Sequence, residues 1–239
     1  MVSPRRSQTL TRNRLLDALS SEERQRIAAS TTSVPMLPGS EFYAAGSRIS
    51  NVYFPTVGVV SLMRPVEEGT WIETAVVGRE GMIGIRAFLG GGMSGNQRAI
   101  GAVKGVALRM TADTFRGHVE EGGKLRDVMF AYTQALMAQT AQTVVCNAVH
   151  DIYERCAHWM LQVHDRVDGD EFDLTHESLA DMLAVRRSSV TVAAGTLQRA
   201  GLIQYRRGHV KITDRAALED ASCECYRNVN QEFENVMGA

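Results

Sequence analysis

The pattern of apolar and polar residues changes twice along the chain and divides it into three stretches. From about residue 34 to residue 110, short runs rich in Val, Ile, Tyr and Thr are separated by Gly and Pro, as in NVYFPTVGVVSLM and GAVKGVALRM. Such runs are typical of an antiparallel sandwich or barrel. Before them, residues 10–30 carry apolar residues at helical spacing, and SSEER is typical of a helix start capped by Ser. We therefore expect one short N-terminal helix followed by an antiparallel β domain.

A long helix is predicted to begin at about residue 123. Four apolar residues in it are spaced 4, 3 and 4 positions apart, namely Leu125, Met129, Tyr132 and Leu136. This spacing is close to the 3.5-residue period of two helices paired along a seam. A core-facing helix of a monomer would show a similar pattern, but this helix joins two stretches of different texture. We therefore interpret the four residues as a dimer seam.

The segment HESLADMLAVRRSSVTVAAGTLQRAGLIQYRRGHVKIT has the pattern of two helices followed by a hairpin. Thr175 can cap its first helix, the tight connection AVRR follows, and a second helix is expected over about 187–200. Gly201 stands where a left-handed residue commonly ends a helix, and two short strands flank Gly208. This order is the plan of a winged helix-turn-helix, whose second helix enters the major groove of DNA.

Two adjacent arginines, Arg186 and Arg187, stand at the start of the second helix. The helix dipole disfavours cations there by a few tenths to about 1 kcal/mol. A phosphate or a guanine edge opposite the arginines would turn this cost into a gain. From Asp173 to Thr213, six Lys and Arg residues stand against three Asp and Glu, in a chain whose net charge is -1. The positive charge is therefore concentrated where the motif predicts contact with DNA.

The predicted DNA-binding residues come from the start of the first helix, the outward stripe of the second helix and the hairpin. We expect Arg187 to contact a base and the hairpin to contact the DNA backbone. One arginine alone would be an ordinary surface charge, so the prediction depends on the whole group. The group consists of Thr175, His176, Arg186, Arg187, Ser188, Ser189, Thr191, Val192, Gln198, Arg199, Arg206, Arg207, His209 and Lys211.

The stretch LTHESLADMLAVRRSSVTVAAGTLQRAGLI resembles the winged helix of the Crp/Fnr family of bacterial transcription regulators, and VGREGMIGIRAFLGGGMSGNQRAIGAV is similar to its sensor. The resemblance covers almost the whole chain. It implies an α+β fold with an N-terminal antiparallel, jelly-roll-like β-roll sensor over 1–122, a long dimerisation helix over 123–147 and a C-terminal winged helix-turn-helix over 148–239. It also implies a homodimer that binds a pseudo-palindromic operator in double-stranded DNA, with RNA polymerase as a partner if the protein is an activator.

The resemblance also indicates where an effector would bind. In the family members that bind cyclic nucleotides, a Gly-Glu pair holds the ribose and a later Arg holds the phosphate. Here Gly84 is followed by Ile85, whereas Arg98 and Ala99 resemble the phosphate-binding position. These four residues are the candidate ligand-binding residues, and we expect cAMP not to be the effector. An unknown small molecule, a partner protein or no effector remain as alternatives.

The composition narrows the class of protein. Hydrophobic residues make up 44% of the 239 residues, but none of their runs reaches the 18 residues of a membrane span. The first sixteen residues lack an apolar run after their basic residues, so we expect no secretory signal. The four cysteines are sparse, and none lies in the first 145 residues. This pattern favours free thiols in a reducing, cytoplasmic protein.

Signals for metals and cofactors are weak at this stage. Oxygen-sensing members of the resembled family bind an iron–sulfur cluster through N-terminal cysteines, which this chain lacks. Cys223 and Cys225 are closer together than the usual C-x-x-C pair. His150, His158 and His164, with Cys156 nearby, are not paired at the i, i+4 spacing of a zinc helix. We therefore predict no metal and no cofactor.

Signals for enzymatic activity are also weak. Residues 90–95 fit G-x-G-x-x-G, but a predicted strand follows where a dinucleotide site needs a helix. No catalytic triad or carboxylate pair has a local signature, so we expect a regulator rather than an enzyme. The alternative is a ligand-binding or protein-interaction module whose winged helix does not bind DNA.

Overall fold

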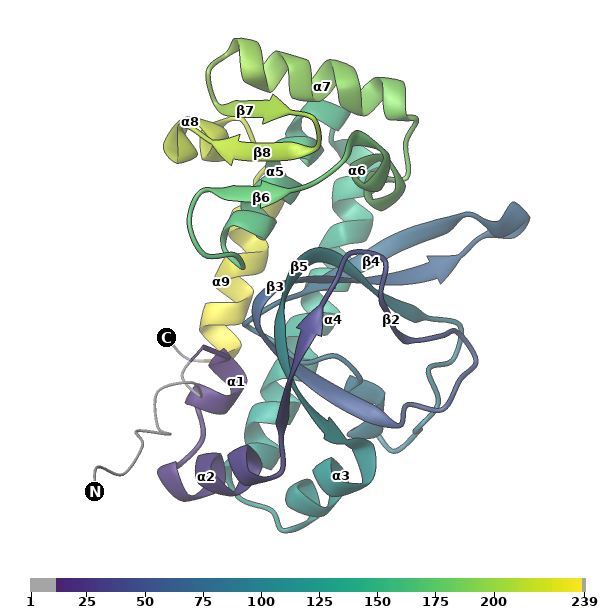
Figure 1. The fold of residues 1–239 in the computed structure, drawn as a ribbon, viewed down its shortest axis with the longest axis vertical. Helices are drawn as coiled ribbons and strands as arrows, with labels where there is room; N and C mark the ends of the chain where they lie inside the picture. The colour runs from purple at the N-terminus through teal and green to yellow at the C-terminus, as the bar shows by residue number, and fades with distance from the viewer. Residues whose placement is uncertain (1–11, 238–239) are drawn as a thin grey trace.

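A computed structural model describes residues 12–237 (Figure 1). Residues 1–11, which hold most of the stretch in which no secretory signal was expected, lie outside the described residues. The single helix predicted over 10–30 is instead two helices, α1 (Arg14–Asp17) and α2 (Ser21–Ala29). Asn13 caps the start of α1. Ser20 explains the break between the helices, because it caps the start of α2 in a reciprocal capping box with Glu23.

The predicted antiparallel β domain is confirmed. Its sheet has the order β1-β5-β3-β4, and β2 pairs with β5. β3 and β5 approach closely at Gly105, where a Cβ atom would lie 1.8 Å from the carbonyl oxygen of Val57. The strands are β1 (Thr32–Met36), β2 (Glu41–Tyr43), β3 (Asn51–Pro65), β4 (Trp71–Val77) and β5 (Arg98–Thr111), with short 3-10 turns η1 (Glu67–Gly69) and η2 (Ile85–Ala87).

The long helix is present as α4 (Lys124–Val149), after the short helix α3 (Ala112–Glu120). Its predicted dimer seam is wrong, because those residues belong to the chain's own core. Leu125, Met129 and Tyr132 are at most 2% exposed, and the Tyr132 hydroxyl donates to the carbonyl of Met82 at 3.0 Å. Leu136 packs partly buried against the same core. The alternative of a core-facing stripe therefore describes these residues.

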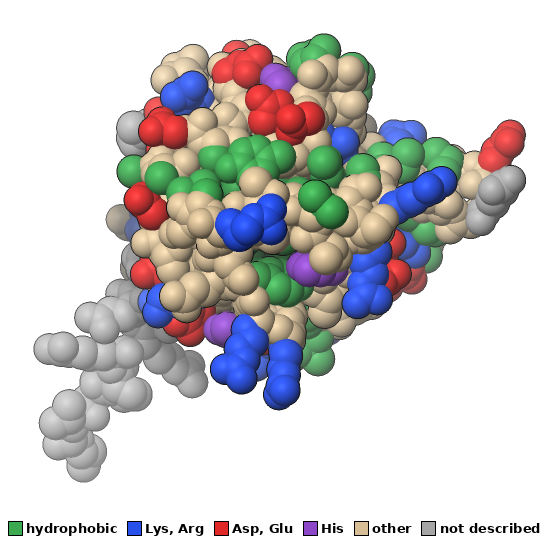
Figure 2. Space-filling view, turned by 90° about the horizontal axis from the view of Figure 1, so that it is seen from above, with side chains coloured by type: hydrophobic (Ala, Val, Ile, Leu, Met, Phe, Trp, Pro, Cys, Tyr) green, Lys and Arg blue, Asp and Glu red, His purple; other side chains and the backbone are tan. Residues whose placement is uncertain are grey.

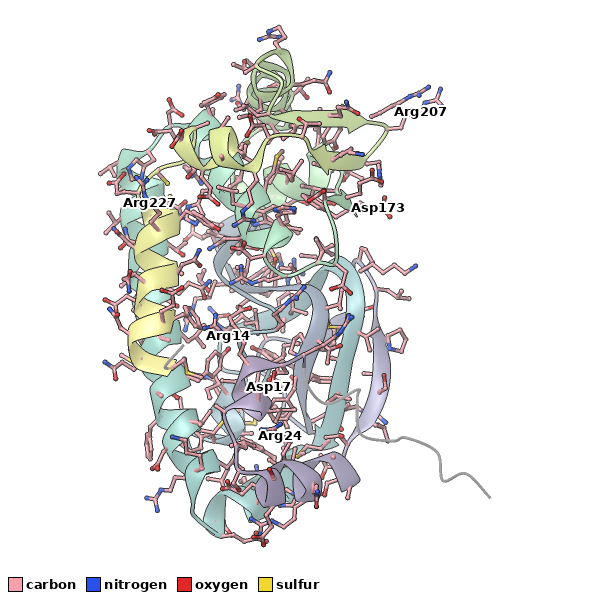
Figure 3. All side chains as sticks on the ribbon, turned by 90° about the vertical axis from the view of Figure 1, so that its left-hand side faces the viewer. Arg14, Asp17, Arg24, Asp173, Arg207 and Arg227 are labelled. Atoms are coloured by element: carbon pink, nitrogen blue, oxygen red, sulfur yellow. The ribbon has the colours of Figure 1, made fainter. Side chains whose placement is uncertain are left out.

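The C-terminal part follows the predicted order of two helices and a hairpin. A third strand, β6, joins the hairpin and gives an antiparallel sheet with the order β6-β8-β7. The last helix, α9, lies along α4 (Figures 1 and 3). The elements are α5 (Ile152–His164), β6 (Glu171–Asp173), α6 (His176–Leu183), α7 (Arg187–Arg199), β7 (Ile203–Arg206), β8 (His209–Ile212), α8 (Arg215–Asp220) and α9 (Cys225–Met237).

The β-roll and the C-terminal part share a second hydrophobic core. Val59 and Val103 of the β-roll sheet pack with α5, α6 and α7 in this core. A buried polar contact reinforces it, because the Trp159 ring N–H donates to the Glu73 carboxylate at 2.9 Å. Burial raises the pKa of Glu73 to about 7. Among the described residues, no helix combines the length and the apolar character needed to cross a bilayer.

Candidate nucleic-acid interface

Packing of α7 determines which of its side chains face solvent. Val190, Ala193, Ala194 and Leu197 are at most 3% exposed and recur at the i, i+3, i+4 and i+7 spacing of one helix face. This face packs on α5 and α6. The connection from α6 turns sharply, since Ala184 adopts the left-handed conformation with φ 52°. The opposite face of α7 is thereby presented at the end of the molecule (Figure 1).

The N-terminal half of that outer face holds four of the predicted DNA-binding residues in exposed positions. Arg186, Arg187, Ser188 and Val192 are exposed, and Val192 reaches 68% exposure. The Arg187 Nε atom lies 3.6 Å from a carboxylate oxygen of Glu177, but both side chains are 68% exposed. Such a pair stabilises the fold by 1 kcal/mol at most, so Arg187 is held only loosely.

Thr175, His176 and Thr191 have structural partners. The Thr175 hydroxyl accepts the Ser178 N–H and caps α6. His176 stacks on Tyr205 with ring centroids 4.2 Å apart, and its Nδ1 lies 3.0 Å from the Thr191 hydroxyl. Burial and the nearby Arg187 lower the pKa of His176, which favours the neutral ring. These contacts brace α6, α7 and β7 against one another, so His176 and Thr191 act first as positioning residues.

The remaining predicted residues of α7 differ in their positions. Gln198 accepts the Tyr205 backbone N–H at 2.7 Å and joins α7 to the hairpin. Arg199 donates to the Thr196 hydroxyl at 2.9 Å. Both lie at the C-terminal end of α7, roughly 18 Å from Arg187 at 1.5 Å per residue. Ser189 lies next to the exposed group but is only partly exposed.

The hairpin of β7 and β8 presents two arginines at its turn. The turn residues Arg207 and Gly208 have φ angles of 52° and 82°, as the two-residue turn that matches strand twist requires. A non-glycine residue in this left-handed region costs roughly 1–2 kcal/mol. Arg206 and Arg207 are exposed, and Arg207 extends outward from the hairpin (Figure 3).

The charges on β8 are compensated by the neighbouring strand β6. His209 lies 3.0 Å from a carboxylate oxygen of Asp173, and Lys211 lies 2.9 Å from one of Glu171. These pairs raise the pKa of His209 and lower that of Glu171. Glu171 lies outside the segment 173–213, so part of the positive charge of that segment is compensated from a neighbouring strand. Alternation of acids in EFD and bases in HVK is the signal that could have revealed the pairing. Figure 2 looks onto this end of the molecule and shows basic side chains in separate groups.

The four candidate ligand-binding residues of the sensor are not gathered into one site, which corrects that prediction. Ile85 and Ala99 are buried in the core of the β-roll. The Arg98 guanidinium stacks instead on the Trp71 ring, 3.9 Å from its centroid. Arg98 lines a cleft of about 870 Å³ between the β-roll and the α6–α7 region, whose lining includes neither Gly84 nor Ile85. Alternation along β5 explains the result, because adjacent residues of a strand point to opposite faces.

The geometry defines a winged helix-turn-helix attached to a β-roll by a long helix. Residues 154–221 match the family model of the Crp-like helix-turn-helix domain. No match is found among curated protein sequences.

Solved structures with the same fold cover most of the chain. FixK2 from Bradyrhizobium japonicum is 15% identical, with a TM-score of 0.67 over 81% of this chain and 98% of its own. A putative transcriptional regulator of the Crp/Fnr family from Eubacterium rectale is 15% identical, with a TM-score of 0.64 over 87% of this chain and 96% of its own. A CRP-family regulator from Thermus thermophilus is 20% identical, with a TM-score of 0.63 over 79% and 96%.

These comparisons confirm the predicted resemblance. Residues 154–221 form a Crp-like helix-turn-helix domain, and the chain has the fold of the Crp/Fnr regulators.

Proposed function

We propose that the protein binds a specific operator as a homodimer, with α7 in the major groove and the β7–β8 hairpin on the DNA backbone. The observation that carries this proposal is the exposed group of Arg186, Arg187, Ser188 and Val192 on the outer face of α7. Arginine can contact guanine O6 and N7 with two hydrogen bonds, and an exposed valine can contact a thymine methyl. The buried opposite face keeps this group on a rigid helix.

Within the hairpin, Arg206 and Arg207 are the proposed phosphate contacts. Both arginine side chains are exposed, whereas His209 and Lys211 would have to give up their acidic partners on β6 to bind DNA. We therefore expect the two arginines to make most of the contacts with the DNA backbone that were predicted for all four residues.

A different face of α4 supports the homodimer. Six residues of α4 that are not buried recur at 4, 3, 4, 3 and 4 positions, which is the heptad spacing of paired helices. Three of them are large apolar side chains left in solvent: Phe130 is 54% exposed, Met137 68% and Val144 66%. Two copies paired along this stripe would cover these side chains. The stripe consists of Phe130, Gln134, Met137, Ala141, Val144 and Ala148.

The test is an operator selection followed by a salt titration. DNA sites are selected from a random pool with the purified full chain, and affinity for the best site is compared with that for scrambled DNA. We expect a pseudo-palindromic site and an affinity that falls steeply with salt, because phosphate contacts release counterions. Equal binding to all sequences would contradict base recognition by α7. Absence of any DNA binding by a folded dimer would favour the ligand-binding or protein-interaction alternative.

We propose the cleft beside Arg98 as the place where an effector would bind. Its walls come from the β-roll and from Asp181, Met182 and Arg186 of the α6–α7 region. A small molecule in this cleft would contact both parts of the chain. If the protein activates transcription, we expect it to contact RNA polymerase as well.

A further inference from the structure

A group of metal-ligating side chains lies away from the proposed DNA interface. Cys146 and His150 come from the end of α4, whereas Cys223 and Cys225 come from the start of α9 and the turn before it. One ligand atom from each of the four residues lies within 4.8 Å of all the others. We call these four residues the Cys3His cluster. The fold brings together residues that are more than seventy positions apart.

The cluster is enclosed by protein. Cys146 is 6% exposed, Cys223 3% and Cys225 0%, and the His150 side chain is 10% exposed. All three cysteines are free thiols. The three sulfurs and the imidazole of the cluster therefore lie in a site that is largely shielded from solvent.

Two of the separations match those of ligands on one tetrahedral ion. With metal–sulfur bonds of about 2.3 Å and metal–nitrogen bonds of about 2.0–2.1 Å, ligand atoms lie roughly 3.8 Å apart for two sulfurs and roughly 3.6 Å apart for sulfur and nitrogen. The Cys146 and Cys223 sulfurs are 3.6 Å apart. The Cys225 sulfur is 3.5 Å from His150 Nδ1. The four ligand atoms thus need only small side-chain rotations to meet one ion.

A second layer of polar groups fits the same interpretation. His150 directs Nδ1 at the sulfurs, while its Nε2 lies 3.2 Å from a carboxylate oxygen of Glu224. A carboxylate behind an imidazole is the arrangement that fixes the orientation of a metal-binding histidine. The Gln142 amide donates to the Cys225 sulfur at 3.0 Å. His158 Nδ1 lies 3.5 Å from the Cys223 sulfur.

We propose that the Cys3His cluster binds one thiophilic divalent ion per chain, with Zn²⁺ as the first candidate. Three thiolates and one imidazole complete a tetrahedral shell, which is the closed coordination of a structural zinc site. A disulfide between Cys146 and Cys223 would leave the approach of Cys225, His150 and Glu224 without a role. The close spacing of all four ligand atoms favours a single ion over a cluster of several irons.

Binding would require thiolates, so the ion would displace the thiol protons of the three cysteines. The expectation that the chain binds no metal is thus replaced by this proposal. The signal for this site in the sequence is the i, i+4 pair of Cys146 and His150, which pairs a cysteine with a histidine rather than two histidines.

The experiment uses the full chain, reduced, freed of metal with a chelator and titrated with Co²⁺ and then Zn²⁺. We expect one equivalent of Co²⁺ to give the absorption bands of a tetrahedral ion with thiolate ligands, and Zn²⁺ to displace it. X-ray absorption of the zinc form should show three sulfurs and one nitrogen. A Co²⁺ spectrum without thiolate bands, or no binding by the folded protein, would overturn the proposal.

Variants distinguish binding at the Cys3His cluster from unspecific binding of metal to any buried cysteine. Cys223→Ser should abolish stoichiometric binding, and Glu224→Gln should weaken it by about 10-fold to 100-fold because it removes the partner of His150. Cys156→Ala is the matched control, since Cys156 is equally buried but belongs to the core of the C-terminal part. It should keep one ion per chain. If Cys223→Ser does not fold, the absorption data on the unaltered chain decide. Recovery of the reduced protein as a Cys146–Cys223 disulfide after brief exposure to air, with no uptake of Co²⁺ before it, would also overturn the proposal.

Discussion

The start of α7 and the face of β8 carry the same kind of charge in different surroundings. Arg186 and Arg187 are exposed and loosely held, whereas His209 and Lys211 lie against Asp173 and Glu171 of β6. A count of charges along the sequence treats the two regions alike. The fold distinguishes them, because strand pairing places acids beside the bases of β8. We therefore expect DNA contacts from the positive charges that the fold leaves only loosely paired.

The largest effect is expected from disrupting the proposed dimer, because a monomer would contact one half-site of the operator instead of two. Met137→Glu places a charge in the exposed stripe of α4 and should produce monomers at micromolar concentration with greatly weakened operator binding. Sedimentation and operator titration measure both effects. Val66→Glu is the matched control, because Val66 is a similarly exposed apolar residue in the β3–β4 turn, away from the stripe. A dimeric Met137→Glu protein with full affinity would rule out the stripe as the interface.

Arg187→Ala tests the loosely paired start of α7 directly. We expect a loss of roughly 1–3 kcal/mol on the operator and a relaxed preference at one base pair per half-site. Stability should hardly change, because the pair with Glu177 is exposed. Arg227→Ala, which removes an exposed arginine from α9 (Figure 3), should leave binding unchanged. Equal losses on operator and scrambled DNA would make Arg187 a phosphate contact instead.

Arg207→Asn tests two roles of Arg207 separately: the backbone strain at the hairpin turn and the proposed contact with a DNA phosphate. Asparagine followed by Gly208 is a favoured sequence for this turn, so the free energy of unfolding should rise by a few tenths to about 1 kcal/mol. Affinity for all DNA sequences should fall, and the salt slope should decrease by about 1. Denaturant unfolding and salt titration of one preparation give both values. A variant that gains stability and keeps its slope would place Arg207 off the DNA.

Glu171→Gln tests whether the acidic residues of β6 keep the basic side chains of β8 from binding DNA. Without the carboxylate, Lys211 and His209 lose a partner and become available to phosphates, so affinity for scrambled DNA should rise and the salt slope should steepen by less than about 1. Asp127→Asn removes the same charge from the exposed start of α4 and serves as the control. Lys211→Ala in the otherwise unaltered chain should change the slope little. If Lys211→Ala alone lowers the slope by about 1, the compensation inferred for β8 is wrong.

The smallest effect concerns pH. Asp173 and Glu171 raise the pKa of His209 above its usual value of 6.5, so protonation of His209 favours the folded state. Its contribution is fully present below about pH 6.5 and is lost as the pH rises through the raised pKa. The difference in unfolding temperature between the unaltered chain and His209→Gln should therefore be larger at about pH 5.5 than at about pH 8.5. A difference that grows with pH would contradict this assignment.

Local patterns predicted the elements better than they predicted the faces. The second helix and the hairpin of the winged domain are predicted closely from the sequence, because Gly201 marks the end of the helix and Gly208 marks the turn of the hairpin. The predicted seam residues of α4 lie in the chain's own core instead, since Met129 and Phe130 are adjacent and only packing against the β-roll decides which one is buried. Arg98 and the Cys3His cluster depend on contacts between distant segments. No single stretch of sequence encodes those contacts.

The connection between α4 and α5 is only His150 and Asp151, because α4 ends at Val149 and α5 begins at Ile152. In a dimer joined along α4, this connection is the pivot that carries α7 toward or away from its counterpart. Two recognition helices fit successive major grooves only when they lie about 34–36 Å apart. The angle at this pivot therefore sets which spacing of half-sites the dimer can read. His150 belongs both to this connection and to the Cys3His cluster. A bound ion would therefore fix the angle between α4 and α5, and with it the half-site spacing that the proposed dimer can bind.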